Sequence, residues 1–499
     1  MEYVIQNREP KLPLQYFEEI SAIPRGSHNE AAVAAYVAQR AKELGLYVRH
    51  DEANNVVVKK PGSKGCESLP ALMLQSHLDM VCEKNQDTVH DFMKDGIEFV
   101  VEGNVLRANG TTLGADNGGG VAFMLALMDA DSDQFAHPPL EFLFTAGEEV
   151  GFTGAIALDC SDITARRMVG LDCGSEGTFC ISSAGTQEID LRIPYEYESR
   201  VGSWLNACLK IKVRGLKGGH SGGCITHELG NANKILGRVL HKLQEKMDLA
   251  LIEIKGGLMF NAIPREADAI VAINSGCLQL AQDEVAKLNE IIRNELAFSD
   301  ADVCIKTEIA AIAGSAEKGE LDQMMSLNAT KTIVNTLYLV HNGVYMMNMA
   351  IPGLPVTSSN MGVVSMKEDG VNINFMMRSS NRSVKEEQKA RIIEVAKLCG
   401  VQQIAVSDWM PEWSFDPNSK MRETAKNVYK EMTGNEVVEH GGHGGLELGV
   451  FCDKMPGIDI ISTGWNGGGA HTVTEWMDMD SYGRVYEFLK KLIEKLSEE

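Results

Sequence analysis

Three short apolar runs, each followed at once by acidic or histidine residues, constrain the fold of this chain more than any other feature. They read "ALMLQSHLDMV", "LEFLFTAGEE" and "RRMVGLDCG". Continuous apolar runs of this length suit strands buried on both faces of a sheet. A helical pattern, "GVAFMLALMDA", lies between the first two, so strands and helices alternate as in an α/β layer. In an open α/β sheet the ligand crevice lies at the carboxyl ends of the strands, where these polar residues follow.

An earlier segment, "SHNEAAVAAYVAQRAKELG", predicts an amphipathic helix that ends near Gly45. Ser27 and Glu30 have the spacing of a capping box, in which each side chain bonds a backbone N–H of the first turn. We therefore expect this helix to begin just after Ser27.

The chain changes character around residue 188 and again near residue 390. Between these points, "LKIKVRGLKGGHSGG" and "VNINFMMRSS" indicate strands of a second sheet, with a helix over about residues 231–246. Afterwards helical patterns return, and "IDIISTG" adds one more buried strand. A chain of 499 residues exceeds what one core usually supports. We expect an α/β fold: a three-layer α/β/α domain, residues 1–187 and 393–499, interrupted by an α+β domain, residues 188–392.

The charge balance argues against polyanionic partners. With 69 acidic and 47 basic residues the chain carries a formal charge of −22, whereas nucleic acids and anionic membranes attract Lys and Arg. Neither a signal-like N-terminal segment nor an apolar run of about 18 residues is present. Eleven cysteines without a CxxC pair indicate reduced thiols. We expect a cytoplasmic protein without nucleic acid or membrane partners.

Four short polar segments follow or interrupt the apolar runs, and each is ambiguous alone. "SHLDMV" places His77 and Asp79 on one side of a strand, where a carboxylate can hold an imidazole in the tautomer that a metal needs. "TTLGADNGGG", "VGLDCG" and "GGGAHTVTEW" contribute Asp116, Asp172 and His471. Each of these segments also fits an ordinary turn or a hydrogen-bonded strand end.

Together these segments predict a metal centre. Two histidines and three carboxylates suit two divalent ions that share one bridging carboxylate. Mixed nitrogen and oxygen donors favour zinc, with manganese or cobalt as alternatives. Two adjacent ions can stabilise both the attacking oxygen and the oxyanion of a hydrolytic reaction. The candidate ligands are His77, Asp116, Glu149, Asp172 and His471.

The neighbouring acids Glu148 and Glu149 in "TAGEEVGFTG" fit two separate tasks. Adjacent side chains on a strand point to opposite faces. We expect Glu149 to bind metal and Glu148 to stay free as general base and proton donor. The alternative is a pair of solvated surface acids.

The segments "SHLDMV", "GADNGGG", "TAGEEVGFTG", "LDCG", "GGHSGG", "NAIPREA" and "GAHTVTEWM" resemble, in this order, motifs of the M20 metallopeptidases. The resemblance runs nearly end to end. It is strongest to the Xaa-His dipeptidase subgroup, also called aminoacyl-histidine or cytosol non-specific dipeptidases.

The resemblance implies a role for each predicted ligand. It implies that Asp79 orients His77 and that Glu148 is the catalytic base. The Asp at position 172 implies activity on peptides with a free N-terminus. One ion is implied to bind His77, Asp116 and Asp172, and the other Asp116, Glu149 and His471.

The inserted segment resembles the family's lid, which implies a homodimer formed through it. By resemblance, His220 would stabilise the oxyanion, Asn261 would line the cleft and Arg378 would bind the substrate carboxylate. Each has a structural alternative: His220 would cap a turn, Asn261 would hold a loop, and Arg378 would form an ion pair. "HGGHGGLELG" resembles a substrate loop, which adds His443 and Glu447 as candidate substrate-binding residues.

The expected function is metal-dependent hydrolysis of small peptides with a free N-terminus, including Xaa-His dipeptides such as carnosine. One alternative is an M20-type deacylase or carboxypeptidase acting on N-acyl amino acids. Another is a non-catalytic metal- or peptide-binding protein on the same scaffold.

Overall fold

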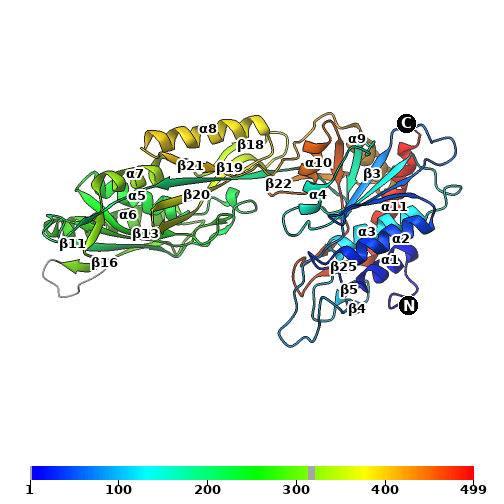
Figure 1. Ribbon diagram of the computed structural model, residues 1–499, viewed down its shortest axis with the longest axis horizontal. Helices are drawn as coiled ribbons and strands as arrows, with labels where there is room; N and C mark the ends of the chain where they lie inside the picture. Colours follow the sequence, from blue (N-terminus) through cyan, green and yellow to red (C-terminus); the bar gives the residue numbers. More distant parts are fainter. Residues whose placement is uncertain (1–2, 313–320, 499) are drawn as a thin grey trace. The chain divides into compact units, whose positions relative to one another are not determined.

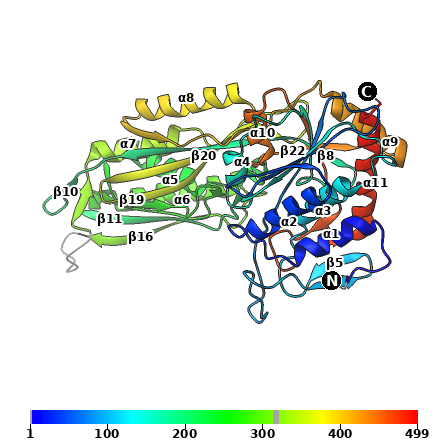
Figure 2. The same ribbon diagram turned by 45° about the vertical axis from the view of Figure 1, so that its right-hand side comes forward.

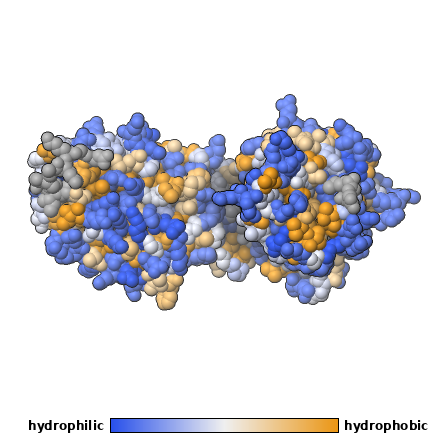
Figure 3. Space-filling model, turned by 90° about the horizontal axis from the view of Figure 1, so that it is seen from below, coloured by the Kyte–Doolittle hydropathy of each residue, from blue (hydrophilic) through white to orange (hydrophobic). Residues whose placement is uncertain are grey.

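The computed structural model describes residues 3–312 and 321–498. These residues divide into two compact units, of which unit 1 comprises 1–182, 413–441 and 446–499 and unit 2 comprises 183–412 and 442–445. Within the described ranges, none of the helices is long and apolar enough to cross a membrane. Hydrophilic residues cover most of the face drawn in Figure 3, with hydrophobic ones scattered among them.

The central sheet of unit 1 has eight strands within the described residues. Its inner strands β3 and β6 are fully buried, as the apolar runs predict, although each also contains polar residues. β3 pairs in parallel with β6 and with β7, and β23 pairs in parallel with β7. The strand order is β1 (Tyr47–His50), β2 (Val56–Lys60), β6 (Leu140–Thr145), β3 (Leu72–His77), β7 (Arg167–Gly170), β23 (Asp459–Ser462), β8 (Thr178–Ser183) and β22 (Val438–Gly442).

Helices cover this sheet, which gives the predicted three-layer α/β/α arrangement (Figures 1 and 2). The helix α3 packs against α1, α2 and β3, while α9 packs against α11 and β23. Tyr482 of α11 stacks on Phe123 of α3, with ring centroids 4.1 Å apart. The helices are α1 (Lys11–Ser21), α2 (Ala31–Glu43), α3 (Ala115–Asp129), α4 (Thr153–Ala157), α9 (Lys420–Thr433), α10 (Leu448–Lys454) and α11 (Met479–Leu496).

Unit 2 is built on an antiparallel sheet with nine strands in the part of the chain described. Buried and half-buried residues alternate along β9, so one face of the sheet carries the core. That core also takes in apolar residues of the four helices α5 (Ala232–Gln244), α6 (Leu278–Glu295), α7 (Leu327–Leu339) and α8 (Arg382–Leu398). The strands are β16 (Cys304–Ile312), β11 (Ala207–Arg214), β15 (Ala267–Ile273), β13 (Leu249–Gly256), β19 (Pro355–Lys367), β20 (Gly370–Ser379), β9 (Gly185–Ile193), β21 (Gln403–Val406) and β18 (Gly343–Met347).

Two local expectations differ from the structure. The predicted domain boundary at residue 392 falls inside α8, and unit 2 continues to Glu412 because β21 pairs with β9. The predicted capping box of α2 is wrong, since this helix begins at Ala31 and its N-cap residue, Glu30, makes no side-chain cap hydrogen bond. Ser27 Oγ instead donates a hydrogen bond of 2.8 Å to Asp79.

Candidate active site

Unit 1 collects the predicted ligands where its parallel strands end. His77 is the last residue of β3, and Glu148 and Glu149 follow β6. Asp172 lies just beyond β7, and His471 lies in the loop between the short strands β24 (Gly467–Gly468) and β25 (Trp476–Asp478), which follow β23 in the chain. Because the carboxyl ends of parallel strands share one edge of the sheet, these segments meet there.

The first group consists of His77, Asp116 and Asp172, whose candidate ligand atoms lie within 4.8 Å of one another. Nε2 of His77 is 3.1 Å from Asp116 Oδ1 and 3.3 Å from Asp172 Oδ1. Asn117 Nδ2 donates a hydrogen bond of 2.7 Å to Asp172 Oδ1, which orients that carboxylate.

The second group consists of Asp116, Glu149 and His471, again within 4.8 Å. Nε2 of His471 is 3.3 Å from Asp116 Oδ2 and 2.9 Å from Glu149 Oε1. Asp116 therefore faces one histidine with each of its oxygens, as a bridging carboxylate would. The structure brings all five predicted ligand residues together.

The electrostatics of the two groups indicate an excess of negative charge. Hydrogen bonds to Asp116 and Glu149 raise the pKa of His471 to about 10. Burial opposes the charging of His77, but the carboxylates of Asp172 and Asp116 outweigh it and raise its pKa. Burial likewise opposes ionisation of Asp116, yet the two histidines lower its pKa. With three carboxylates and two imidazoles the site favours a net negative charge, which bound cations would neutralise.

Glu148 belongs to neither of these groups, although its carboxylate lies within 4.8 Å of ligand atoms of His77 and Glu149. Burial, followed by the nearby Asp172 carboxylate, raises the pKa of Glu148. A carboxyl group with a raised pKa beside the reacting atoms is suited to accept and return a proton.

Asp79 links the histidine to the glutamate pair. Its Oδ1 is 3.4 Å from His77 Nδ1 and accepts a hydrogen bond of 3.1 Å from the backbone N–H of Glu148. Its Oδ2 accepts hydrogen bonds from the N–H of Glu149, at 3.2 Å, and from Ser27, at 2.8 Å. One fully buried carboxylate thus orients both the imidazole and the loop after β6.

Two buried residues that support the site were not predicted from the sequence. Glu475 accepts hydrogen bonds from the backbone N–H groups of Leu113 and Gly114 with one oxygen and of Asp116 with the other. Arg25 donates hydrogen bonds to the carbonyl oxygens of Leu78, Asp79 and Gly114. Glu475 stands four residues after His471, and this proximity is the only signal in the sequence that could have revealed it.

In unit 2, three of the predicted substrate-binding and catalytic residues lie close together. Arg378 is 4% exposed, and it donates a hydrogen bond to Ser221 and lies 3.3 Å from Nε2 of His220. Nε2 of His443 is 2.7 Å from the hydroxyl of Ser358, which pairs with Arg378 across β19 and β20. Among the residues described, no carboxylate forms an ion pair with Arg378, and burial lowers its pKa to about 10.

The other two predicted substrate-binding residues occupy different positions. Asn261 immediately precedes β14 (Ala262–Ile263), and its carbonyl accepts a hydrogen bond from the N–H of Ser221. Glu447 belongs to unit 1 and is 2% exposed. Its Oε2 accepts hydrogen bonds from Gln75, at 2.6 Å, and Thr145, at 2.8 Å. Contact of either residue with substrate stays a prediction.

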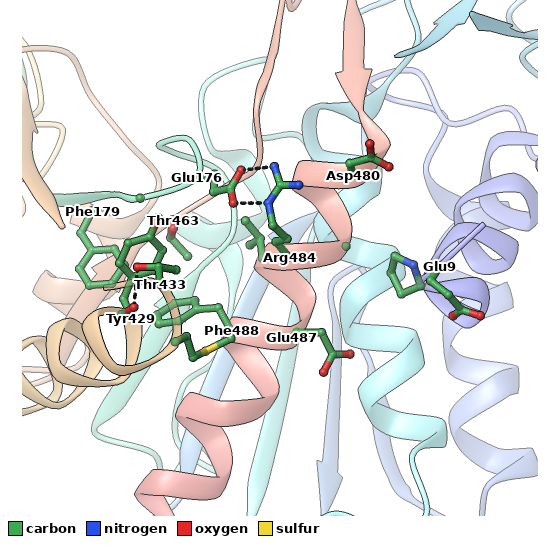
Figure 4. A pocket seen from close by; sticks show the side chains of 15 residues that line it. Glu9, Glu176, Phe179, Tyr429, Thr433, Thr463, Asp480, Arg484, Glu487 and Phe488 are labelled. Carbon is green, nitrogen blue, oxygen red and sulfur yellow. Dashed lines mark hydrogen bonds and ion pairs between the residues drawn. The ribbon is translucent and has the colours of Figure 1, made fainter. Parts of the chain in front are cut away.

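Two cavities of unit 1 differ in their relation to this site. One, of about 190 Å³, is lined by Asp116 and Asp172. The other, of about 600 Å³, shares none of its described lining residues with the first. Figure 4 shows that Arg484 in the larger cavity points at Glu176, and the two form an ion pair of 2.6 Å. The arginine of the larger cavity is thus paired with a glutamate of the same cavity, whereas the smaller cavity adjoins the predicted ligands.

Comparison with known proteins identifies the family of this chain. The sequence model of the peptidase family M20/M25/M40 matches residues 73–495. Cytosol non-specific dipeptidase of Escherichia coli (strain K12) is 34% identical over 484 residues, 96% of each chain. The crystal structure of aminoacylhistidine dipeptidase from Vibrio alginolyticus superposes with a TM-score of 0.91 at 32% identity, over 98% of this chain and 97% of that one.

Aminopeptidase PepT from Bacillus cereus ATCC 10987 shares the fold at 16% identity, with a TM-score of 0.56 over 97% of this chain and 98% of its own. The family model matches most of the chain, and the Escherichia coli relative matches nearly its full length. This chain is a member of peptidase family M20/M25/M40.

Proposed function

We propose that this protein is a dipeptidase that uses two divalent metal ions to hydrolyse small peptides with a free N-terminus. The observation that carries the proposal is the convergence of five donor residues into two groups that share Asp116. The names of the two full-length relatives, both dipeptidases, support the substrate class.

The donor set fits a dinuclear centre. His77, Asp116 and Asp172 would hold one ion, and Asp116, Glu149 and His471 the other. Imidazole and carboxylate donors are compatible with zinc, and we propose Zn²⁺, with Co²⁺ and Mn²⁺ as alternatives. Such a pair of ions polarises a substrate carbonyl and favours ionisation of water.

Glu148 is the proposed general base. Its carboxylate would accept a proton from the attacking water and return it to the nitrogen of the leaving amine as the peptide bond breaks. Asp79 fixes the backbone N–H of both Glu148 and Glu149, so the base keeps its position while protons move.

Substrate contacts are proposed for residues of unit 2 as well. Arg378 is a buried guanidinium without a carboxylate partner among the described residues, which suits recognition of the C-terminal carboxylate of a peptide. Its neighbour His220 would donate a hydrogen bond to the developing oxyanion. Asn261, His443 and Glu447 remain proposed substrate contacts.

We also propose a cytoplasmic location and a homodimer formed through unit 2. Leu258 and Met259 of that unit are 94% and 54% exposed, which provides apolar surface for a second copy. Light scattering on the purified protein would measure the molar mass of the assembly. If the double variant Leu258→Asp, Met259→Asp kept the molar mass of a dimer, these two residues would not form the dimer interface.

The substrate class is tested by offering matched pairs of dipeptides, one free and one N-acetylated, to enzyme loaded with defined metals. We expect hydrolysis of the free dipeptides, including carnosine and other Xaa-His compounds. Preference for the acetylated member would support the deacylase alternative. Fully metal-loaded protein that cleaves neither would support the non-catalytic alternative.

A further inference from the structure

A third group of candidate metal-binding side chains lies in unit 1. Cys173, Cys180 and His440 bring two sulfur atoms and an imidazole nitrogen within 4.8 Å of one another. None of the three belongs to the proposed dinuclear centre. Cys180 is fully buried and the other two are half-buried.

The sheet itself places these residues together. Cys180 lies in the middle of β8 and His440 in the middle of the neighbouring strand β22. Cys173 follows β7, and Ser462 of β23 fixes its backbone: the serine hydroxyl accepts a hydrogen bond from the N–H and donates one to the carbonyl. Cys180 and His440 are thus held on two neighbouring strands, and Cys173 lies in a loop whose backbone is hydrogen-bonded to a third strand.

The spacing of the three donor atoms is compatible with one metal ion. Sulfur and nitrogen ligands of one zinc ion lie about 3.5 to 3.8 Å apart, given Zn–S and Zn–N bonds of about 2.3 and 2.0 Å. Three donor atoms within 4.8 Å reach these separations by small side-chain rotations. Two thiols and one imidazole also form a donor set that prefers zinc to magnesium or calcium.

We propose that Cys173, Cys180 and His440 form a third metal site, which binds a thiophilic divalent ion such as Zn²⁺. The two thiols release their protons to solvent as the ion binds, and the imidazole binds as the neutral base. Three protein ligands leave one tetrahedral position open, which a water molecule would fill.

The site is distinct from the dinuclear centre but adjacent to it in the chain. Cys173 follows Asp172 directly, and both line the cavity of about 190 Å³. The donor sets nevertheless differ, because the dinuclear centre offers only oxygen and nitrogen. This difference gives the third site its own spectroscopic signature.

Cobalt substitution tests the proposal without reference to activity. Protein purified with a thiol-free reductant is stripped of metal and titrated with Co²⁺. We expect a thiolate-to-cobalt charge-transfer band in the near ultraviolet, which oxygen and nitrogen ligands do not produce. Elemental analysis after zinc loading should give one more ion per chain in the wild type than in the Cys173→Ser, Cys180→Ser variant.

Matched variants make the outcome specific. The band should disappear in the double variant and in Cys173→Ser alone. The single variant leaves the buried Cys180 unchanged and alters only a half-buried position, so loss of the band there is not explained by misfolding. The band should persist in Cys160→Ser, another half-buried cysteine of unit 1, and in Glu149→Gln. A band absent from the wild type, or one retained without both thiols, would overturn the proposal. Mass spectrometry of the intact protein gives a further check. A mass lower by two hydrogen atoms, which a Cys173–Cys180 disulfide that persists despite the reductant would cause, would also overturn the proposal.

Discussion

The backbone N–H of Glu148 donates a hydrogen bond of 3.1 Å to the buried carboxylate of Asp79. The same carboxylate lies beside His77 and also accepts a hydrogen bond from the N–H of Glu149. A proposed histidine ligand, a proposed glutamate ligand and the proposed base therefore depend on one side chain from the loop after β3.

Asp79→Asn tests this dependence. The amide group of asparagine would turn an N–H donor toward either the loop N–H groups or His77, so one contact is lost. We expect kcat/KM or metal affinity to fall by about 10- to 100-fold, as is usual for residues that orient metal ligands. Steady-state kinetics and metal titration measure both. Asp133→Asn, at an exposed turn, should leave both unchanged.

Glu148→Gln and Glu149→Gln should separate the tasks of the glutamate pair. Glu148→Gln removes the proton acceptor, and we expect kcat to fall by about 10²- to 10⁴-fold with both ions still bound. Glu149→Gln removes a proposed ligand, so one ion per chain should be lost. Elemental analysis alongside kinetics distinguishes the variants. If the metal loss occurs instead in Glu148→Gln, the two roles are reversed.

Glu475 should contribute to stability as well as to the site. Its carboxylate accepts three backbone hydrogen bonds from the segment that leads into Asp116. Glu475→Ala leaves these N–H groups without their acceptor, and we expect a loss of about 1 to 3 kcal/mol in unfolding free energy. Urea denaturation measures it, with the exposed Glu487→Ala as control. An unchanged midpoint would show that solvent replaces Glu475.

The elements that were predicted correctly have a local pattern. The buried strands β3 and β6 begin in apolar runs; His77 ends β3, and Glu149 lies in the loop after β6. Once these strands are placed in parallel, their ends must meet, so the convergence of the polar residues at this edge could be inferred before any distance was known.

The missed features depend on contacts between distant parts of the chain. Arg25 reaches the carbonyl of Gly114, and Glu475 reaches the N–H of Leu113, pairings that no local periodicity encodes. Ser27 has the spacing of a helix cap but donates to Asp79 instead. The boundary at residue 392 failed for the same reason, because β21 belongs with β9 only through pairing.

His443 should make the protein sensitive to acid. Burial, together with the charge of Arg378, lowers the pKa of His443 to about 3. Below its ordinary pKa of about 6.5 the unfolded chain binds a proton that the folded chain excludes. Stability is therefore lost as the pH falls from 6.5 toward 3, by up to about 1.4 kcal/mol per pH unit for this single group.

The measurement compares urea midpoints of the wild type and His443→Gln between pH 7 and pH 5. The variant cannot take up this proton when it unfolds, so its midpoint should fall less steeply with acidity. His50→Gln, at an exposed position, should follow the wild type. Parallel slopes for the wild type and His443→Gln would contradict the acid sensitivity assigned to this residue.

Arg378 should determine whether the enzyme requires a free carboxylate on its substrate. The guanidinium is buried beside Ser221 and His220 without an acidic partner among the described residues, and a substrate carboxylate would supply that partner. A hydrogen bond to a charged group contributes about 1.5 to 3 kcal/mol, so Arg378→Met should raise KM for dipeptides by about 10- to 100-fold. Dipeptide amides lack the carboxylate, and their KM should change much less.

Arg391→Met, on the exposed side of α8, should alter neither KM. Equal losses for dipeptides and their amides would mean that Arg378 supports the fold of unit 2 rather than the recognition of the substrate's C-terminus.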